Sequence, residues 1–222
     1  MRRRGLMGGI EGYINGYVKK GLIFYLDGID KGSTDGTWTD LIKGLKFNNV
    51  NVEDKPVGWY FNKSAYFENT QAHNIVSNYN YTVEVIFTPY ERANCFVFHI
   101  LPNGAGVPVF HLGTSNMITW LQYYYEYPLN IVANTLYMCG FNSNKGVINN
   151  SPVSIGSHSD YWSGQAGDSY RFIIGCRKNN NSYKEYFKGM IYSIRIYDRK
   201  LSQDEILSNQ DNDITRYNLN IT

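Results

Sequence analysis

The chain has 222 residues, of which 43% are hydrophobic and 16% aromatic, a length and composition typical of one folded domain. Lys and Arg number 21 against 19 Asp and Glu, so the net charge of +2 argues against a dedicated DNA- or RNA-binding protein. The aromatic content excludes intrinsic disorder. The 21 Gly and 25 Asn residues indicate many turns and few helices.

The three cysteines, Cys95, Cys139 and Cys176, are odd in number and widely spaced, and they form no zinc-binding pattern. This usage favours synthesis in a reducing compartment. The first four residues are basic, but glycine-rich sequence follows where a signal peptide would have its apolar core. No run approaches the roughly 18 apolar residues of a membrane span. We therefore expect no signal peptide and no transmembrane segment.

Residues 1–20 are basic and rich in glycine, and we interpret them as an N-terminal arm. Such a segment buries too little apolar surface to fold alone, so we expect it to contact a partner protein. An arm that folds back on its own domain is the alternative. The residues expected to anchor the arm are Arg2, Arg3, Arg4, Leu6, Met7 and Ile10.

The chain from residue 22 onward has the pattern of short strands. Residues 22–26 form an apolar run closed by an Asp-Gly turn, and residues 82–88 and 96–101 alternate in polarity. Further strands are expected at 107–112, 117–124, 135–141, 153–156, 170–175 and 190–197. Many short strands between Gly, Asn and Pro turns predict a sandwich or barrel.

One helix is expected near residues 202–209. Ser202 and Glu205 form a capping box, in which each side chain accepts a hydrogen bond from the other residue's backbone N–H. Leu201 and Ile206 supply the matching hydrophobic staple. The helix is predicted to end near Asn209.

Two segments carry a family resemblance. The first is Gly21–Gly28 (GLIFYLDG), followed by Trp38–Leu41 (WTDL). The second is Phe187–Ile206, which follows the pattern F-x-G-x-I-x-x-x-R-I-Y-x-x-x-L-S-x-x-E-I. Together they resemble the concanavalin A-like, laminin-G-type (LamG) jelly-roll domains. The resemblance implies an all-β fold, a two-sheet antiparallel jelly-roll sandwich with one short C-terminal helix.

The resemblance also sets the expected domain limits. The jelly roll would span residues 21–217, with the arm at 1–20 and a C-terminal tail at 218–222. Within its closing motif, we expect Gly189 to let the chain enter a central strand beside a bulky neighbour. Arg195 faces away from the core residues of that strand, and it therefore needs a carboxylate or carbonyl partner.

The basic start that leads into such a domain is similar to structural and tail proteins of bacteriophages from gut Bacteroidetes. The abundance of Asn, Tyr, Ile and Lys suits an AT-rich genome of that kind. This resemblance implies a virion component, either a capsid decoration or part of a tail or fibre. The other virion proteins would be its partners.

The sequence favours a protein that is not an enzyme. Glycosidases use paired carboxylates about 5–10 Å apart, and glucanases of this fold carry them on one strand. Glu84 is alone on its strand, and helix capping accounts for Asp204 and Glu205. The chain also lacks a nucleophile elbow, an HExxH motif and a Ser/His/Asp grouping.

Aromatic side chains in two segments are candidates for binding a glycan or a protein partner. Tyr and Trp stack on sugars in lectins and dominate protein interfaces, although half of these rings would fill the core in the alternative interpretation. The candidates are Trp120, Tyr123, Tyr125, Tyr127, His158, Asp160, Tyr161 and Trp162.

Two polar groups have weaker functional interpretations. Asp27, Asp30 and Asp35 lie in one glycine-rich loop that could bind calcium, although Asp and Gly are also ordinary turn residues. His99 and His111 fall in expected strands, where a histidine with one hydrogen bond is the simpler interpretation.

We therefore predict a non-catalytic binding or structural module of a virion, which uses a lectin-like domain for surface or glycan attachment. It would contact neither nucleic acid nor membrane, and it would belong to a multi-chain assembly. A free carbohydrate-binding lectin is the first alternative, and a glycoside hydrolase relative is the second.

Overall fold

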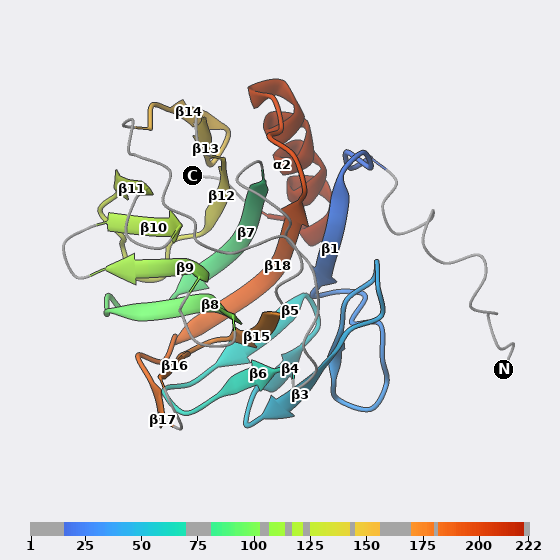
Figure 1. Cartoon of the computed structure of the whole chain (residues 1–222), viewed down its shortest axis with the longest axis vertical. Helices are drawn as coiled ribbons and strands as arrows, with labels where there is room; N and C mark the ends of the chain where they lie inside the picture. Colours follow the sequence, from blue (N-terminus) through green and yellow to red (C-terminus); the bar gives the residue numbers. More distant parts are fainter. Residues whose placement is uncertain are drawn as a thin grey trace, which may run out of the picture.

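The structure is a computed structural model, and it forms two stacked antiparallel sheets (Figure 1). It describes residues 16–69, 81–102, 107–113, 117–121, 125–142, 145–155, 170–179 and 182–219. The part of the chain so described contains no helix long and apolar enough to cross a bilayer.

The first sheet has eight strands, and β18 is its central member because it pairs with three others. From one edge to the other the strands are Ser151–Val153 (β14), Gly146–Ile148 (β13), Tyr137–Phe141 (β12), Thr82–Pro89 (β7), Gly189–Tyr197 (β18), Gly58–Phe61 (β5) and Glu53–Lys55 (β4). The last strand, Leu22–Asp27 (β1), pairs with the C-terminal half of β18.

The second sheet also has eight strands. In spatial order they are Tyr125–Pro128 (β11), Met117–Leu121 (β10), Val107–Gly113 (β9), Cys95–Pro102 (β8), Tyr170–Ile174 (β15), Tyr66–Glu68 (β6), Lys46–Val50 (β3) and Trp38–Thr39 (β2). A separate hairpin of Arg177–Asn179 (β16) and Ser182–Lys184 (β17) follows β15 in the chain. The predicted two-sheet antiparallel sandwich is confirmed.

The core between the sheets is built largely of aromatic rings. Trp38, Trp59 and Phe67 lie together, with ring centroids 4.9 Å apart for Trp59 and Phe67. Phe24 of the first sheet stacks on Phe172 of the second at 5.0 Å. Each of these rings is almost fully buried, and burying an aromatic side chain of this size stabilises the fold by about 2–3 kcal/mol. The aromatic side chains, whose abundance excluded intrinsic disorder, therefore form the packing that joins the two sheets.

Two glycines allow close approaches that a side chain would block. Gly189 has a φ of 148°, and a Cβ there would lie 2.1 Å from the carbonyl oxygen of Thr88. The expected role of Gly189 at the start of a central strand is thus confirmed. Gly140 of β12 lies against Ile206, whose Cγ2 would be 2.4 Å from an added Cβ. This contact brings the helix close to the first sheet.

The C-terminal helix, Gln203–Tyr217 (α2), starts as predicted and ends later (Figure 1). Ser202 is the N-cap and both hydrogen bonds of its capping box with Glu205 are present. The helix continues past Asn209, the predicted end, to Asn218, whose backbone is left-handed with a φ of 51°. The prediction stopped too early because the face that meets the sheet in the second half is mainly polar.

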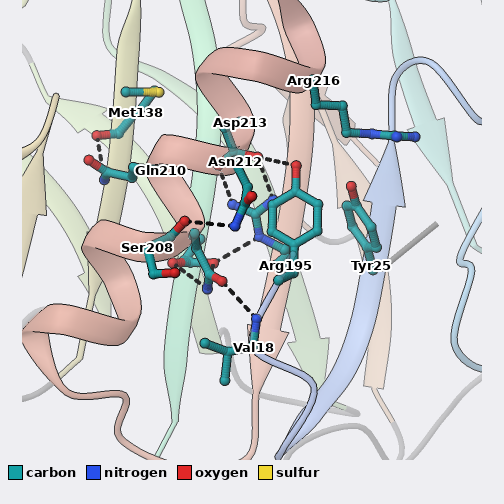
Figure 2. A network of polar contacts seen from close by, with 12 residues as sticks. Val18, Tyr25, Met138, Arg195, Ser208, Gln210, Asn212, Asp213 and Arg216 are labelled. Carbon is teal, nitrogen blue, oxygen red and sulfur yellow. Dashed lines mark hydrogen bonds and ion pairs between the residues drawn. The ribbon is translucent and has the colours of Figure 1, made fainter. Parts of the chain in front are cut away.

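The polar face of α2 surrounds Arg195 on the outer face of the first sheet (Figure 2). The guanidinium Nε donates to Glu84 Oε2 at 2.8 Å, and its NH1 donates to Asp213 Oδ1 at 2.7 Å. Asn209 donates to both carboxylate oxygens of Glu84, at 3.1 and 3.0 Å. The expectation that Arg195 needs a carboxylate partner is confirmed, and two carboxylates fill the role.

The first described residues pack against the same network. Tyr17 donates from its hydroxyl to Asp213 Oδ1 at 2.7 Å, and its ring lies 4.4 Å from the Arg195 guanidinium. The N–H of Val18 donates to Asn209 Oδ1 at 2.9 Å. Only 5% of Tyr17 is exposed. Tyr17 and Val18, which the sequence analysis assigns to the arm, therefore pack against the domain.

Breaking the Arg195 network should destabilise the whole fold. Arg195→Met leaves Glu84 and Asp213 buried without their cation, and we expect the free energy of unfolding to fall by about 3–5 kcal/mol. Urea denaturation followed by tryptophan fluorescence measures this change. Lys46→Met is the control, because Lys46 and its partner Asp35 are both more than half exposed. Equal losses of unfolding free energy in both variants would contradict the stabilising role of Arg195.

Candidate functional site

The outer face of the second sheet carries the hairpin β16–β17, which is attached through one carboxylate. In β6, Phe67 belongs to the core, so its neighbours Tyr66 and Glu68 lie on the outer face. Glu68 accepts hydrogen bonds from Lys178 Nζ and from the Tyr183 hydroxyl, both at 2.6 Å. The hairpin is thereby held over residues of β6 that lie more than a hundred positions earlier in the chain.

Three tyrosines gather at this attachment point. The ring of Tyr66 stacks on that of Tyr183 with centroids 4.3 Å apart, and Tyr186 lies 6.5 Å from Tyr66. All three are half-buried, so each ring also presents surface to solvent. Burial raises the pKa of Tyr66 and Tyr183 to about 12, and their hydroxyls therefore stay protonated at neutral pH. We call Tyr66, Glu68, Lys178, Tyr183 and Tyr186 the tyrosine cluster.

A second group lies on the other side of the same hairpin, around Phe96 of β8. The ring of Phe96 stacks on His111 at 4.4 Å and meets the edge of His99 at 5.4 Å. The Arg177 guanidinium lies 5.7 Å from the Phe96 ring. We call Phe96, His99, His111 and Arg177 the histidine cluster.

The two histidines of this cluster are neutral at physiological pH. His99 is 4% exposed, and burial, with a smaller contribution from the Arg177 charge, lowers its pKa to about 4. Burial also lowers the pKa of His111, whose Nε2 is hydrogen-bonded to Asn94. In the described part of the chain, His99 Nδ1 has no hydrogen-bond partner. His99 therefore has one unsatisfied ring nitrogen, and His111, with its bond to Asn94, matches the expected strand histidine with one hydrogen bond.

Among the binding residues predicted from the sequence, Tyr127 is the one whose side chain the structure describes. Tyr127 is half-buried against the core, with its ring 6.5 Å from Phe141. Trp120 and Tyr125 are placed in β10 and β11, next to each other in the second sheet, but their side chains are not described. The other candidates, Tyr123, His158, Asp160, Tyr161 and Trp162, lie outside the described residues, as do Arg2, Arg3, Arg4, Leu6, Met7 and Ile10.

The three loop aspartates proposed for calcium have separate partners. Asp27 is fully buried, where it forms an ion pair with Arg216 and accepts hydrogen bonds from Tyr25 and two backbone N–H groups. Asp30 accepts from the Gly32 N–H, and Asp35 accepts from Thr37. Across the described ranges, no three His, Cys, Asp or Glu side chains are grouped as metal ligands. Calcium binding here stays a prediction.

The buried carboxylates and thiols are placed for packing. Glu84 and Asp213 are buried beneath α2 and both are bound to Arg195, so neither carboxylate is free to act on a glycosidic bond. The three cysteines are buried and unpaired. Burial raises the pKa of Cys95 and Cys176 to about 12, which leaves them as inert thiols at neutral pH.

The sequence analysis missed the tyrosine cluster for an identifiable reason. Its residues come from three short strands, β6, β16 and β17, and from Tyr186 after β17, and none of these strands is long enough to show the apolar alternation used to find strands. The run of three asparagines at 179–181 was an available turn signal between two polar segments. It would have indicated the hairpin, although not its position over Glu68.

The comparisons with known proteins support the fold. No family model matches the sequence, and no curated protein matches it significantly. The Trypanosoma rangeli sialidase in complex with sialic acid matches 86% of this chain with a TM-score of 0.60 and 16% identity. A mutant of HCR/D, a clostridial toxin binding domain, matches 88% with a TM-score of 0.63 and 13% identity. A heptameric SAP-like pentraxin from Limulus polyphemus matches 64% at 0.51 and 14%.

These similarities define the class of the fold and nothing finer. The three proteins are concanavalin A-like jelly-roll folds, and the described sandwich has the same architecture. The match covers 33% of the sialidase chain, 53% of the toxin domain chain and 73% of the pentraxin chain. The chain thus spans about a third of the length of the sialidase. The LamG and bacteriophage resemblances stay predictions.

The buried histidine should make the protein sensitive to acid. The unfolded chain binds a proton on His99 near pH 6.5, whereas the folded chain does so near pH 4. Stability is therefore fully present above pH 6.5 and is lost as the pH falls toward 4, by up to about 1.4 kcal/mol per pH unit. We expect His99→Gln to reduce the difference in urea stability between pH 7 and pH 5 by about 2 kcal/mol. If His99→Gln leaves this difference in stability unchanged, the buried neutral state of His99 is contradicted. The control variant His111→Gln should retain most of the difference in stability between pH 7 and pH 5.

Proposed function

We propose that this chain is a non-catalytic carbohydrate-binding module and that its sugar lies on the tyrosine cluster. The observation that carries the proposal is the pair of stacked rings, Tyr66 and Tyr183, half-exposed beside a Lys178–Glu68 ion pair on the face of a sheet. Aromatic rings with an apolar face and a polar hydroxyl suit the amphipathic surface of a sugar ring. The concanavalin A-like fold and its lectin-like relatives support the same class of function.

The polar groups of the cluster would give the binding its orientation. Lys178 is 21% exposed in its side chain and Glu68 is 15% exposed. An ammonium donates hydrogen bonds and a carboxylate accepts them, so the pair can bind neighbouring hydroxyl groups of one sugar. Both side chains are already fixed by their mutual contact and by Tyr183, which reduces the entropy lost on binding.

The absence of catalysis is part of the proposal. Glycoside hydrolysis needs two carboxyl groups on either side of the scissile bond. In the tyrosine cluster the described carboxylate is Glu68, and it is neutralised by Lys178. Glu84 and Asp213 are sealed beneath α2. A glycan bound on this surface would therefore be held and released unchanged.

Removal of one ring should weaken glycan binding. We expect Tyr183→Ala to lower the affinity for the best ligand on a glycan array by about tenfold, because it removes a stacking surface and a fixed hydroxyl, an effect of about 1.4 kcal/mol. Tyr90→Ala is the matched control, since Tyr90 is 38% exposed and its ring lies beside Tyr60 on the first sheet. Equal binding by both variants would place the sugar elsewhere. Release of reducing sugar by the unmodified protein would overturn the non-catalytic assignment.

We also propose that this module is a component of a bacteriophage virion. As a capsid decoration or tail component, it would attach a particle to surface glycans while residues before Gly16 contact other virion proteins. The support is the sequence resemblance and the firm packing of residues 16–18 on α2.

Deletion of residues 2–15 tests whether these residues anchor the module in a virion. The deletion retains Tyr17 and Val18, so the free energy of unfolding of the isolated protein should stay the same. Incorporation into particles should be lost, as measured by mass spectrometry of purified virions. Normal incorporation of the shortened chain would refute the anchoring role and favour a free lectin.

A further inference from the structure

The histidine cluster concentrates hydrogen-bond donors beside the tyrosine cluster. His99, His111 and Arg177 all lie around the Phe96 ring, with centroid or guanidinium distances between 4.4 and 5.7 Å. Arg177 and Lys178 are consecutive residues of β16, so their side chains point to opposite faces of the hairpin and the two clusters flank it. A glycan of several sugars that crosses the hairpin would contact both clusters.

The donors of the cluster have spare capacity. A guanidinium has five N–H donors, and in the described structure Arg177 uses one, from NH1 to Glu185 Oε2 at the long distance of 3.4 Å. His99 is 4% exposed, and its Nδ1 has no hydrogen-bond partner among the described residues. A buried polar atom without a partner costs about 1–3 kcal/mol, which a ligand can recover. Few buried ring nitrogens are left so without a functional reason.

Glu185 occupies the cluster in the way that an acidic ligand would. Its carboxylate is the partner of Arg177, and its side chain is 24% exposed, so it can be displaced toward solvent. Its backbone has a φ of 55°, a left-handed conformation that is unfavourable for a residue other than glycine. Strained residues of this kind concentrate at binding sites. The backbone oxygen of Glu185 accepts from the Phe96 N–H at 3.1 Å, which fixes its position beside the cluster.

We infer that the histidine cluster is a subsite for the carboxylate of an acidic sugar, which replaces the Glu185 side chain on Arg177 and accepts a hydrogen bond from His99. The inference rests on the proposed function, and it narrows the ligand to sugars that carry a carboxylate. The guanidinium suits a carboxylate because its planar fork donates two parallel hydrogen bonds. The tyrosine cluster would hold another sugar of the same glycan.

Glucuronate and glucose test the subsite, because they share a pyranose ring and differ in the carboxylate. Titration of the full chain, followed by the NMR signals of its histidine rings, should show stronger binding of glucuronate than of glucose. Arg177→Gln should weaken glucuronate binding by at least about tenfold, and it should leave glucose binding unchanged. Glu185→Gln should strengthen glucuronate binding by about threefold or more, because it removes the competing charge.

Lys184→Gln is the matched control, since Lys184 is an exposed cation that faces Arg177 across the same hairpin. It should change glucuronate binding less than twofold. Equal effects of the Lys184 and Arg177 replacements would reduce the subsite to general electrostatic attraction and overturn the inference. Neutral glycan binding that depends on Tyr183, with no preference for glucuronate, would refute the subsite and leave the proposed function standing. Arg177-dependent glucuronate binding, together with neutral glycan binding that is insensitive to Tyr183→Ala, would refute the tyrosine cluster instead.

Discussion

The architecture depends on one buried cation. Arg195 in the central strand of the first sheet is held between Glu84 of the neighbouring strand and Asp213 of α2, with all three side chains almost fully buried. Burial raises the pKa of both carboxyl groups while the guanidinium opposes the shift, so neither partner is well accommodated without the arginine. The helix is thereby fixed in one register on the sheet, and the N-terminal Tyr17 is fixed on the helix. A purely apolar contact would have allowed α2 to slide along the sheet, and the ion pairs of Arg195 prevent this.

The second sheet relies on a weaker attachment of the same chemical type. Glu68 binds Lys178 and Tyr183 in a partly buried site, where solvent screens the charges more than it does around Arg195. The hairpin over this sheet is therefore held firmly enough to present its tyrosines and loosely enough to adjust to a ligand. Fully buried ion pairs stabilise the side that carries α2, and partly buried ones shape the side that offers a binding surface.

The sequence predicted the elements whose side chains alternate and missed those defined by distant contacts. Strands β7 and β18 were found because Val83, Val85, Ile194 and Ile196 repeat at every second position. The segment 46–68 was missed, since its strands have only three to five residues and β3 and β4 are largely polar. The second half of α2 was missed because its buried face consists of Asn209, Gln210 and Asp213, whose partners lie on other strands. The clusters of the candidate site have the same origin, since they join residues 66–68 and 96–111 to the hairpin at 177–186.

The packing of residues 16–18 on α2 determines how the domain is oriented relative to anything attached at its N-terminal side. These residues lie on the outer face of the first sheet, whereas the hairpin lies on the outer face of the second, so the full thickness of the sandwich separates them. A body joined to the N-terminal side of the domain would stand behind it, with the tyrosines facing outward. Many copies fixed in this way on one support would all present the same face, and weak individual contacts would add up to firm adhesion.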